Sequence, residues 1–305
     1  MIKVNGLSKV FKNGKGIYDL SFEVAKGEVF GYLGPNGAGK STTIRNLMGF
    51  TKPTSGKSLI AGLDCWDKSP EIKKNVGYLP GEISFIDGMN GVQFLNLIGG
   101  MQGLKDTNRR DELINRLQFD VKTPIRKMSK GMKQKVGIVA AFMHQPQVLI
   151  LDEPTSGLDP LMQQLFIELI LEEKQRGTTI LMSSHMFQEV ERTCDRVAII
   201  KDGKLLTVEN VHDLRARQRK IIEVTVESRE QLHRLEQSGL NIEGSKDNTA
   251  FIVVQGDYND FVKALVPFNI TNIQIRTMDL EDIFMHYYDR NEVIADKKDK
   301  EVFTQ

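Results

Sequence analysis

Residues 34–42 read Gly34-Pro35-Asn36-Gly37-Ala38-Gly39-Lys40-Ser41-Thr42, and this stretch decides the fold class. It fits the pattern G-x-x-x-x-G-K-[ST], in which glycines let the backbone approach phosphate groups and turn its N–H groups toward them. The apolar run before it, residues 28–33, predicts a buried strand, and residues 40–48 after it are compatible with a helix. A strand, this loop and a helix in that order predict a phosphate-binding loop, because a helix N-terminus favours an anion.

Two carboxylates further along the chain are expected at the same site. The apolar run at residues 148–151 predicts a second buried strand, and Asp152 and Glu153 follow it directly. Ligands of open α/β sheets bind beyond the carboxyl ends of the strands, where the phosphate-binding loop is also expected. A polar strand end without a role would show the same two residues, but the loop earlier in the chain favours a nucleotide site.

Each residue type in the predicted site has its own task. Lys40 is expected to contact the β- and γ-phosphates of a nucleotide, and Ser41 to place its hydroxyl on Mg²⁺. Asp152 is expected to hold the same ion through water, because magnesium usually keeps several of its waters. Glu153 would orient or deprotonate the water that attacks the γ-phosphate.

The first two hundred residues alternate between strand and helix patterns. Strands are predicted at 2–4, 20–24, 58–60, 75–79 and 178–182, with a hairpin of 197–200 and 204–207. Helices are predicted at 161–176 and 186–194, and helical periodicity dominates between about 82 and 144. These patterns predict an α/β fold: a phosphate-loop NTPase core with a mostly parallel sheet, an antiparallel β subdomain and an inserted helical subdomain.

The last third of the chain predicts a small α+β domain behind a linker. Residues 208–220 are polar and basic, which is typical of a linker. Strands are expected at 221–226, 250–254 and 273–277, and helices at 231–238, 258–265 and 279–288. We therefore expect a nucleotide-binding domain at 1–215 with its helical subdomain at about 82–144, an accessory domain at 216–290 and a charged tail at 291–305.

Composition narrows the classes of function. Of the 305 residues, 41 are basic and 40 acidic, so the net charge of +1 gives no case for a nucleic-acid partner. No run of 18 apolar residues exists, so any path across a membrane must come from another chain. The N-terminus lacks the apolar core of a signal peptide, and the two cysteines, Cys65 and Cys194, fit a reducing, cytoplasmic setting.

Four further stretches resemble the ATP-binding-cassette family. The run Met128-Ser129-Lys130-Gly131-Met132-Lys133-Gln134 is similar to its signature motif, LSGGQ. The run Ser156-Gly157-Leu158-Asp159 resembles its D-loop, and His185 resembles its switch histidine. Phe11 stands where the family places an aromatic ring on adenine, although a core aromatic is the alternative. These marks follow the family's order and cover nearly all of residues 1–210.

The resemblance implies an ATPase that is complete only as a pair of chains. Ser129 and Gly131 precede a predicted helix whose N-terminus would present N–H groups to the γ-phosphate of an ATP held by the opposite subunit. Asp159 would help to set the contact between the two subunits. We expect these to be two copies of this chain, and a pair with a sister cassette is the alternative. His185 would reach the γ-phosphate and help Glu153 and Lys40 in hydrolysis. ATP and Mg²⁺ are the cofactors that the resemblance implies.

The sequence departs from the family pattern at two places. In the signature motif, Lys130 replaces the first glycine and Met132 replaces the first glutamine. After residues 75–80 the family has a glutamine that senses Mg²⁺ and couples to the membrane subunit, but this chain has Gly81 followed by Glu82. Two alternatives stay open here: Glu82 substitutes from one residue away, or the role is vacant and the loop is only a hinge.

The resemblance also implies a transporter whose transmembrane permease is a separate chain, docked at the helical insertion. The run Leu280-Glu281-Asp282-Ile283-Phe284 resembles the C-terminal extension of cassettes that serve bacterial multidrug, antibiotic and peptide exporters. The alternative for this extension is a packing or dimer-stabilising module. An importer motor and a cassette without a transport role are the competing functions. The expected location is cytoplasmic, on the inner face of the cell membrane.

Overall fold

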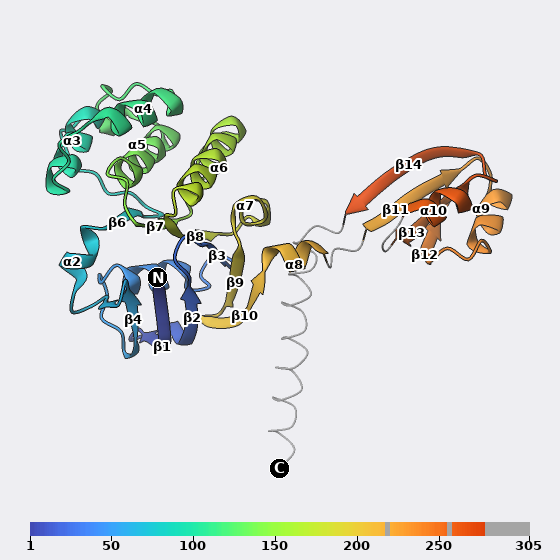
Figure 1. The fold of residues 1–305 in the computed structure, drawn as a ribbon, viewed down its shortest axis with the longest axis horizontal. Coiled ribbons are helices and arrows are strands. Elements are labelled where there is room, and N and C mark those ends of the chain that lie inside the picture. The colour runs from blue at the N-terminus through green and yellow to red at the C-terminus, as the bar shows by residue number, and fades with distance from the viewer. Residues whose placement is uncertain (217–219, 255–257, 278–305) are drawn as a thin grey trace, which may run out of the picture. The chain divides into compact units, whose positions relative to one another are not determined.

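The chain divides into two compact units, Met1–Val211 and His212–Gln305. The structure is a computed structural model that describes residues 1–216, 220–254 and 258–277 (Figure 1). All the residues that the sequence places at a nucleotide site lie in the first unit. Among the described residues, no helix is both long and apolar enough to cross a membrane.

A six-stranded sheet forms the centre of the first unit (Figure 1). Five neighbouring strands are parallel, and the sixth, β10, is an antiparallel edge strand. In spatial order the strands are β10 Lys204–Asn210, β9 Arg196–Lys201, β3 Val29–Leu33, β8 Thr179–Ser184, β7 Val148–Asp152 and β6 Val76–Leu79. Every residue of β3, β7 and β8 is buried, which explains why apolar residues dominate these strands and confirms the predicted parallel core. The carboxyl ends of these three strands meet at one edge of the sheet.

An antiparallel sheet, also predicted, packs against this core. Its strands are β2 Gly16–Val24, β1 Ile2–Val10, β4 Ser55–Ile60 and β5 Leu63–Asp64, in that spatial order. β1 is longer than the predicted strand at 2–4. Its pairing with β2 shifts register after Val4, and Gly6 has a φ of +58°. This irregularity breaks the period-two alternation on which strand prediction depends.

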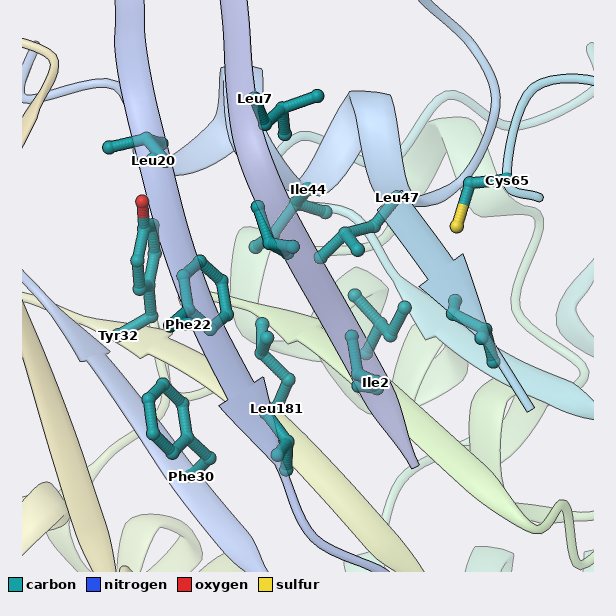
Figure 2. Packing of buried hydrophobic residues seen from close by; sticks show 14 of the residues in the cluster. Ile2, Leu7, Leu20, Phe22, Phe30, Tyr32, Ile44, Leu47, Cys65 and Leu181 are labelled. Carbon is teal, nitrogen blue, oxygen red and sulfur yellow. The ribbon is translucent and has the colours of Figure 1, made fainter. Parts of the chain in front are cut away.

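The core between the two sheets fixes the strand that precedes the phosphate-binding loop. Phe30 of β3 stacks on Phe22 of β2, with ring centroids 5.5 Å apart and planes within 5° (Figure 2). The ring centroid of Tyr32 lies 5.5 Å from that of Phe22. Ile44 and Leu47 of helix α1, Lys40–Leu47, complete this cluster and are fully buried. The loop between β3 and α1 is therefore held between two elements that the core immobilises.

Replacing Phe30 by alanine tests how much this core contributes to the free energy of unfolding. We expect a loss of about 3–5 kcal/mol in the free energy of unfolding, because the cavity would open inside a close-packed cluster. Urea unfolding followed by the fluorescence of Trp66, the single tryptophan, reports on the first unit. The exposed Phe11→Ala should change the same free energy by about 0.5 kcal/mol or less. A Phe30→Ala loss as small as that of the control would contradict the expectation.

Helices are the regular structure of the stretch between residues 91 and 142, within the predicted helical subdomain, and they lie together at one end of the first unit (Figure 1). They are α3 Gly91–Met101, α4 Asn108–Leu117, the 3-10 turn η1 Ile125–Lys127 and α5 Lys130–Phe142. A capping box formed by Asn90 and Gln93 starts α3. The remaining helices of this unit are α2 Ser69–Lys73, which was not predicted, α6 Pro160–Gln175 and α7 Phe187–Thr193.

In the described residues from 220 onward, the second unit has an antiparallel sheet and two helices. Its strands are β12 Ile242–Lys246, β13 Thr249–Val254, β11 Lys220–Val226 and β14 Ile270–Thr277, and its helices are α9 Arg229–Glu236 and α10 Tyr258–Leu265. The predicted α+β pattern is confirmed here, although β12 was missed because its residues are mostly polar or exposed. The predicted helix at 279–288 and the tail at 291–305 fall outside the described residues.

The predicted linker at residues 208–220 contains the boundary between the two units, but most of its length is regular secondary structure. β10 continues to Asn210, and α8 follows directly as Val211–Ala216. Val211 and Leu214 are buried, and their spacing of three residues is that of one helix face. Two apolar residues in a polar and basic stretch carry too little periodicity to predict this helix.

Candidate active site

The loop between β3 and α1 needs glycine at positions where a side chain has no room. A Cβ on Gly34 would stand 2.4 Å from the carbonyl oxygen of Ile200, and one on Gly39 would stand 2.7 Å from Ile17 Cγ2. Gly39 also has a φ of +105°, which L side chains rarely adopt. It caps α1 without a side-chain hydrogen bond, so the N–H groups of the first turn stay available to a ligand.

Lys40 is a nearly buried cation at the start of α1, with 5% of its surface exposed. Its Nζ donates to the carbonyl oxygens of Gly34 at 2.7 Å and Pro35 at 3.2 Å. The same nitrogen lies 3.2 Å from Glu153 Oε1. The loop thus wraps around its own lysine and holds the ammonium group beside the end of β7.

The end of β7 carries the two predicted carboxylates in different settings. Asp152 is 3% exposed and accepts a hydrogen bond of 2.5 Å from Ser183 Oγ of β8. Glu153 leaves the strand with a φ of +49°, and its backbone N–H donates to the same hydroxyl at 3.0 Å. Left-handed backbone in a residue with a side chain stores strain that persists only where the surroundings hold it. Ser183 therefore fixes both acidic residues at once.

The three residues predicted to be catalytic form one chain of contacts. Glu153 reaches Lys40 with one carboxylate oxygen and His185 with the other, since its Oε2 lies 3.2 Å from the Nδ1 of that histidine. His185 follows the end of β8, and 49% of its side chain is exposed. A phosphate at this edge would meet a buried cation, a carboxylate and an accessible imidazole.

A cleft of about 640 Å³ opens beside this chain of contacts. It is lined by Ser41, Arg45, Tyr78, Pro80, Gly81, Glu82, Ile83, Lys130, Lys133, Gln134, Asp152, Glu153 and Ser156. Burial and the charge of the Asp152 carboxylate raise the pKa of Tyr78 to about 12, while Arg45 acts in the opposite direction. The tyrosine hydroxyl therefore stays protonated and able to donate a hydrogen bond at neutral pH.

The oxygen atoms that face this cleft suit magnesium. Ser41 supplies a hydroxyl and Asp152 and Glu153 supply carboxylates, which are the hard ligands that the ion prefers. A Cβ on Gly81 would lie 3.3 Å from Asp152 Oδ2, so no larger group of that residue crowds this oxygen. The described residues contain no cluster of three or more His, Cys, Asp or Glu side chains placed to hold a metal.

The residues of the signature-like stretch lie against the D-loop-like stretch of the same chain. Ser129 caps α5, accepting from the N–H of Met132 at 3.2 Å. The Nζ of Lys130 donates to Ser156 Oγ at 3.0 Å, and its side chain passes over Gly157, where a Cβ would come within 3.1 Å of it. A Cβ on Gly131 would lie 2.8 Å from the carbonyl oxygen of Gly157. Lys130, the departure from the family pattern, therefore joins the two stretches.

Other predicted site residues stand apart from the cleft, since Phe11, Ser129, Gly131 and Asp159 do not line it. Asp159 caps α6 by accepting from the N–H of Met162 at 3.0 Å. Phe11 lies in the turn after β1 with 44% of its surface exposed, and the ammonium group of Lys9 stands 5.7 Å from its ring centroid. Glu82, the possible substitute for a glutamine, does line the cleft and is exposed.

Sequence reasoning missed three residues that hold the site together. Ser183 binds Asp152 because the two residues are paired across β7 and β8, and only strand register shows this. Gln134 of α5 is buried and donates to the carbonyl oxygen of Pro154 at 2.7 Å. Glu189 of α7 accepts hydrogen bonds from Thr155 and Ser184. A lone carboxylate in a helix carries no local signal of such a contact.

Residues 17–156 match the family model described as "ABC transporter". The chain is 38% identical over 229 residues to the bacitracin transport ATP-binding protein BcrA of Bacillus licheniformis, covering 73% of this chain and 74% of that protein. It is 34% identical over 222 residues to the probable multidrug ABC transporter ATP-binding protein YbhF of Escherichia coli K12. That match covers 71% of this chain and 38% of YbhF.

Solved structures resemble the first unit. An ATP-binding subunit of an ABC transporter matches with a TM-score of 0.65 and 31% identity, over 70% of this chain and 92% of that one. The cassette MJ0796, solved as a dimer, matches with a TM-score of 0.62 and 21% identity, over 69% of this chain and 99% of that one. At 21% identity this second likeness is one of fold.

Proposed function

Since this chain belongs to the ATP-binding proteins of ABC transporters, we propose that it hydrolyses ATP and thereby powers export through a separate membrane subunit. The observation that carries the hydrolytic part is the chain of contacts from Lys40 through Glu153 to His185 at the carboxyl edge of β3, β7 and β8. A cation, a carboxylate and an imidazole converge there beside a loop shaped for phosphate.

Binding of the triphosphate rests on the loop at 34–42. Its glycines bring the backbone close to the anion, and the uncapped N–H groups at the start of α1 face it. Lys40 exchanges its contacts with Gly34 and Pro35 for the β- and γ-phosphate oxygens. Ser41 and Asp152 hold Mg²⁺, which when bound would neutralise the charge that develops on the phosphates. Phe11 supplies the surface on which adenine stacks.

Hydrolysis is assigned to Glu153 and His185. Glu153 orients the attacking water and accepts its proton, and its two carboxylate oxygens are already positioned by Lys40 and His185. His185 is accessible enough to meet the γ-phosphate and stabilise the group as it is transferred. The backbone bond from Glu153 to Ser183 keeps the carboxylate at the strand end while the bond breaks.

We further propose that two copies of the chain form the complete site. Ser129 and Gly131, at the N-terminus of the 13-residue helix α5, would serve the γ-phosphate bound by Lys40 of the other copy, and Asp159 would help to set the contact. None of these three lines the cleft of its own chain. The fold is shared with a cassette that was solved as a dimer, which supports this arrangement.

The membrane subunit is expected to dock on the helical insertion, with this chain on the cytoplasmic, inner face of the cell membrane. Export is favoured because one relative is a bacitracin transport protein and another a probable multidrug transporter subunit. The resemblance of residues 280–284 to the extension of exporter cassettes points to the same branch. Recovery of a membrane permease with this chain, together with drug or peptide efflux that depends on Lys40, would test the export assignment.

A linked pair of copies tests the shared site. Ser129→Asp in one copy keeps a good helix cap but places a negative charge where the partner's γ-phosphate should lie. We expect the steady-state ATPase rate of the pair to fall by about half or more, because one of its two pockets loses its donor. Ser129→Thr in the same copy is the control, since it retains both cap and hydroxyl. Full turnover in the Ser129→Asp pair would show that the pockets do not share residues.

A further inference from the structure

Glu189 is a buried carboxylate that the proposed hydrolysis does not yet use. It lies on α7 with 5% of its surface exposed. Its Oε1 accepts from the hydroxyl of Thr155, and its Oε2 accepts from the hydroxyl of Ser184 at 2.8 Å. Both hydroxyl-bearing residues are themselves buried. One side chain therefore ties together two segments that are almost thirty residues apart in the sequence.

Burying a carboxylate is costly unless its hydrogen-bond partners are well placed. No lysine, arginine or histidine of the described residues forms an ion pair with Glu189. Its hydrogen-bond partners are the hydroxyl groups of Thr155 and Ser184. An apolar side chain at this position could pack the helix against the sheet without any such partner. Within the same helix, Thr193 Oγ1 donates to the carbonyl oxygen of Glu189 at 2.7 Å.

The two segments that Glu189 joins are those that carry the reactive groups. Thr155 follows Glu153 by two residues, and Ser184 directly precedes His185. The Ser184 hydroxyl is held further, since the N–H of Met186 donates to it at 2.9 Å. Glu153 and His185 lie 3.2 Å apart, and each is attached to a residue that bonds to the same carboxylate.

We propose that Glu189 is a positioning residue that sets the separation of Glu153 and His185 for attack on the γ-phosphate. This inference rests on the proposed function of those two residues. The Ser183 hydroxyl holds Glu153 by accepting from the Glu153 backbone N–H. Glu189 holds the segment after Glu153 by accepting from the Thr155 hydroxyl. Without the Glu189 carboxylate, the bond from the Glu153 N–H to Ser183 would remain, but the segments that carry Glu153 and His185 would lose the side-chain bridge between Thr155 and Ser184.

The expected effect is on turnover and not on ATP binding. Positioning errors of about 1 Å can lower a rate by about 10²-fold, so Glu189→Leu should reduce kcat by about 10- to 10²-fold. The KM for ATP should stay within about threefold, because the loop meets this bridge through the backbone bond from the Gly34 N–H to the Ser184 carbonyl oxygen, which does not involve the Ser184 side chain. Glu189→Gln should recover most of the rate, since its amide can accept from one hydroxyl and donate to the other.

The decisive experiment measures single-turnover ATP hydrolysis for Glu189→Leu alone and combined with Glu153→Gln. If Glu189 acts through Glu153, its replacement should have little further effect once Glu153 is changed. The control Gln188→Ala alters an exposed neighbour on the same helix and should hydrolyse ATP as the unchanged chain does. Should Glu189→Leu fail to fold, Thr155→Val and Ser184→Ala each remove one hydroxyl donor and leave the carboxylate in place.

The outcomes separate this inference from the function on which it rests. The proposal is overturned if Glu189→Leu, or both donor variants, hydrolyse ATP at the full rate. It is also overturned if Glu189→Leu lowers the rate by the same factor with and without Glu153→Gln, because that marks a purely structural loss. Failure of the proposed function appears differently, as a Glu153→Gln chain that turns over ATP normally.

Discussion

Replacing Glu153 by glutamine is expected to lower ATP hydrolysis by about 10²- to 10⁴-fold while the chain still binds ATP. Glutamine keeps the shape of the side chain but cannot accept the proton of the attacking water. The backbone should not change, since the bond from the Glu153 N–H to Ser183 does not involve the side chain. ATP binding should stay the same or tighten, because the 3.2 Å contact between Lys40 and the carboxylate competes with the phosphates.

Two measurements on the same preparation check this expectation. Phosphate release reports the chemical step, and retention of labelled ATP on gel filtration reports binding and any ATP-bound dimer. Glu168→Gln on α6 is a matched control, since it makes the same chemical change at an exposed carboxylate. A Glu153→Gln chain as fast as the unchanged one would remove Glu153 from the chemistry and leave Lys40 and His185 to be reconsidered.

The elements that carry the site were predictable because they depend on local patterns. Apolar runs marked β3 and β7, a shorter apolar run at residues 180–182 marked β8, and the glycine spacing marked the loop before α1. Residues that follow such runs directly, as Asp152 follows the run at 148–151 and ends β7, must appear at the carboxyl edge of a parallel sheet. Elements with weak patterns were not predicted. The residues of β12 are mostly polar or exposed, and α8 has only Val211 and Leu214 as a buried pair.

The contacts that hold the site in place depend on tertiary pairing and could not be predicted. Ser183 faces Asp152 only because β7 and β8 pair in that register. Glu189 reaches Thr155 and Ser184 only because α7 packs beside the ends of both strands. Gln134 lies within a quoted motif, yet its bond to the Pro154 carbonyl is a consequence of how α5 meets the segment after β7. Motifs therefore identify the reactive groups, while the hydrogen bonds that hold these groups in place follow from the tertiary fold.

Lys130 shows how a departure from a family pattern can be accommodated. A glycine at this position would leave the signature-like stretch with no side-chain link to residues 156–159. Lysine instead crosses Gly157, which has no side chain to obstruct it, and binds Ser156. The contact ties the N-terminus of α5 to the segment that ends at Asp159. Movement of either stretch on nucleotide binding would then carry the other with it.

The last expectation concerns Lys40, whose replacement by alanine should abolish tight ATP binding. Hydrogen bonds to charged groups contribute roughly 1.5–3 kcal/mol each, so losing two phosphate contacts predicts a fall in affinity of about 10²-fold or more. Hydrolysis should disappear with binding, which distinguishes this variant from Glu153→Gln. Lys40→Arg should not restore affinity, because the 5% exposed site leaves little room for a larger, planar group.

Equilibrium titration with a fluorescent ATP analogue measures this loss directly. Lys57→Ala, which removes an exposed lysine of β4, should bind the analogue as the unchanged chain does. The free Lys40→Ala chain should remain folded, because Glu153 keeps its backbone bond to Ser183 and its contact with His185. Affinity within about threefold of the unchanged chain would mean that the loop N–H groups bind the phosphates unaided. In that case the buried ammonium group would serve mainly to hold Glu153, and the two lysine contacts with Gly34 and Pro35 would be structural.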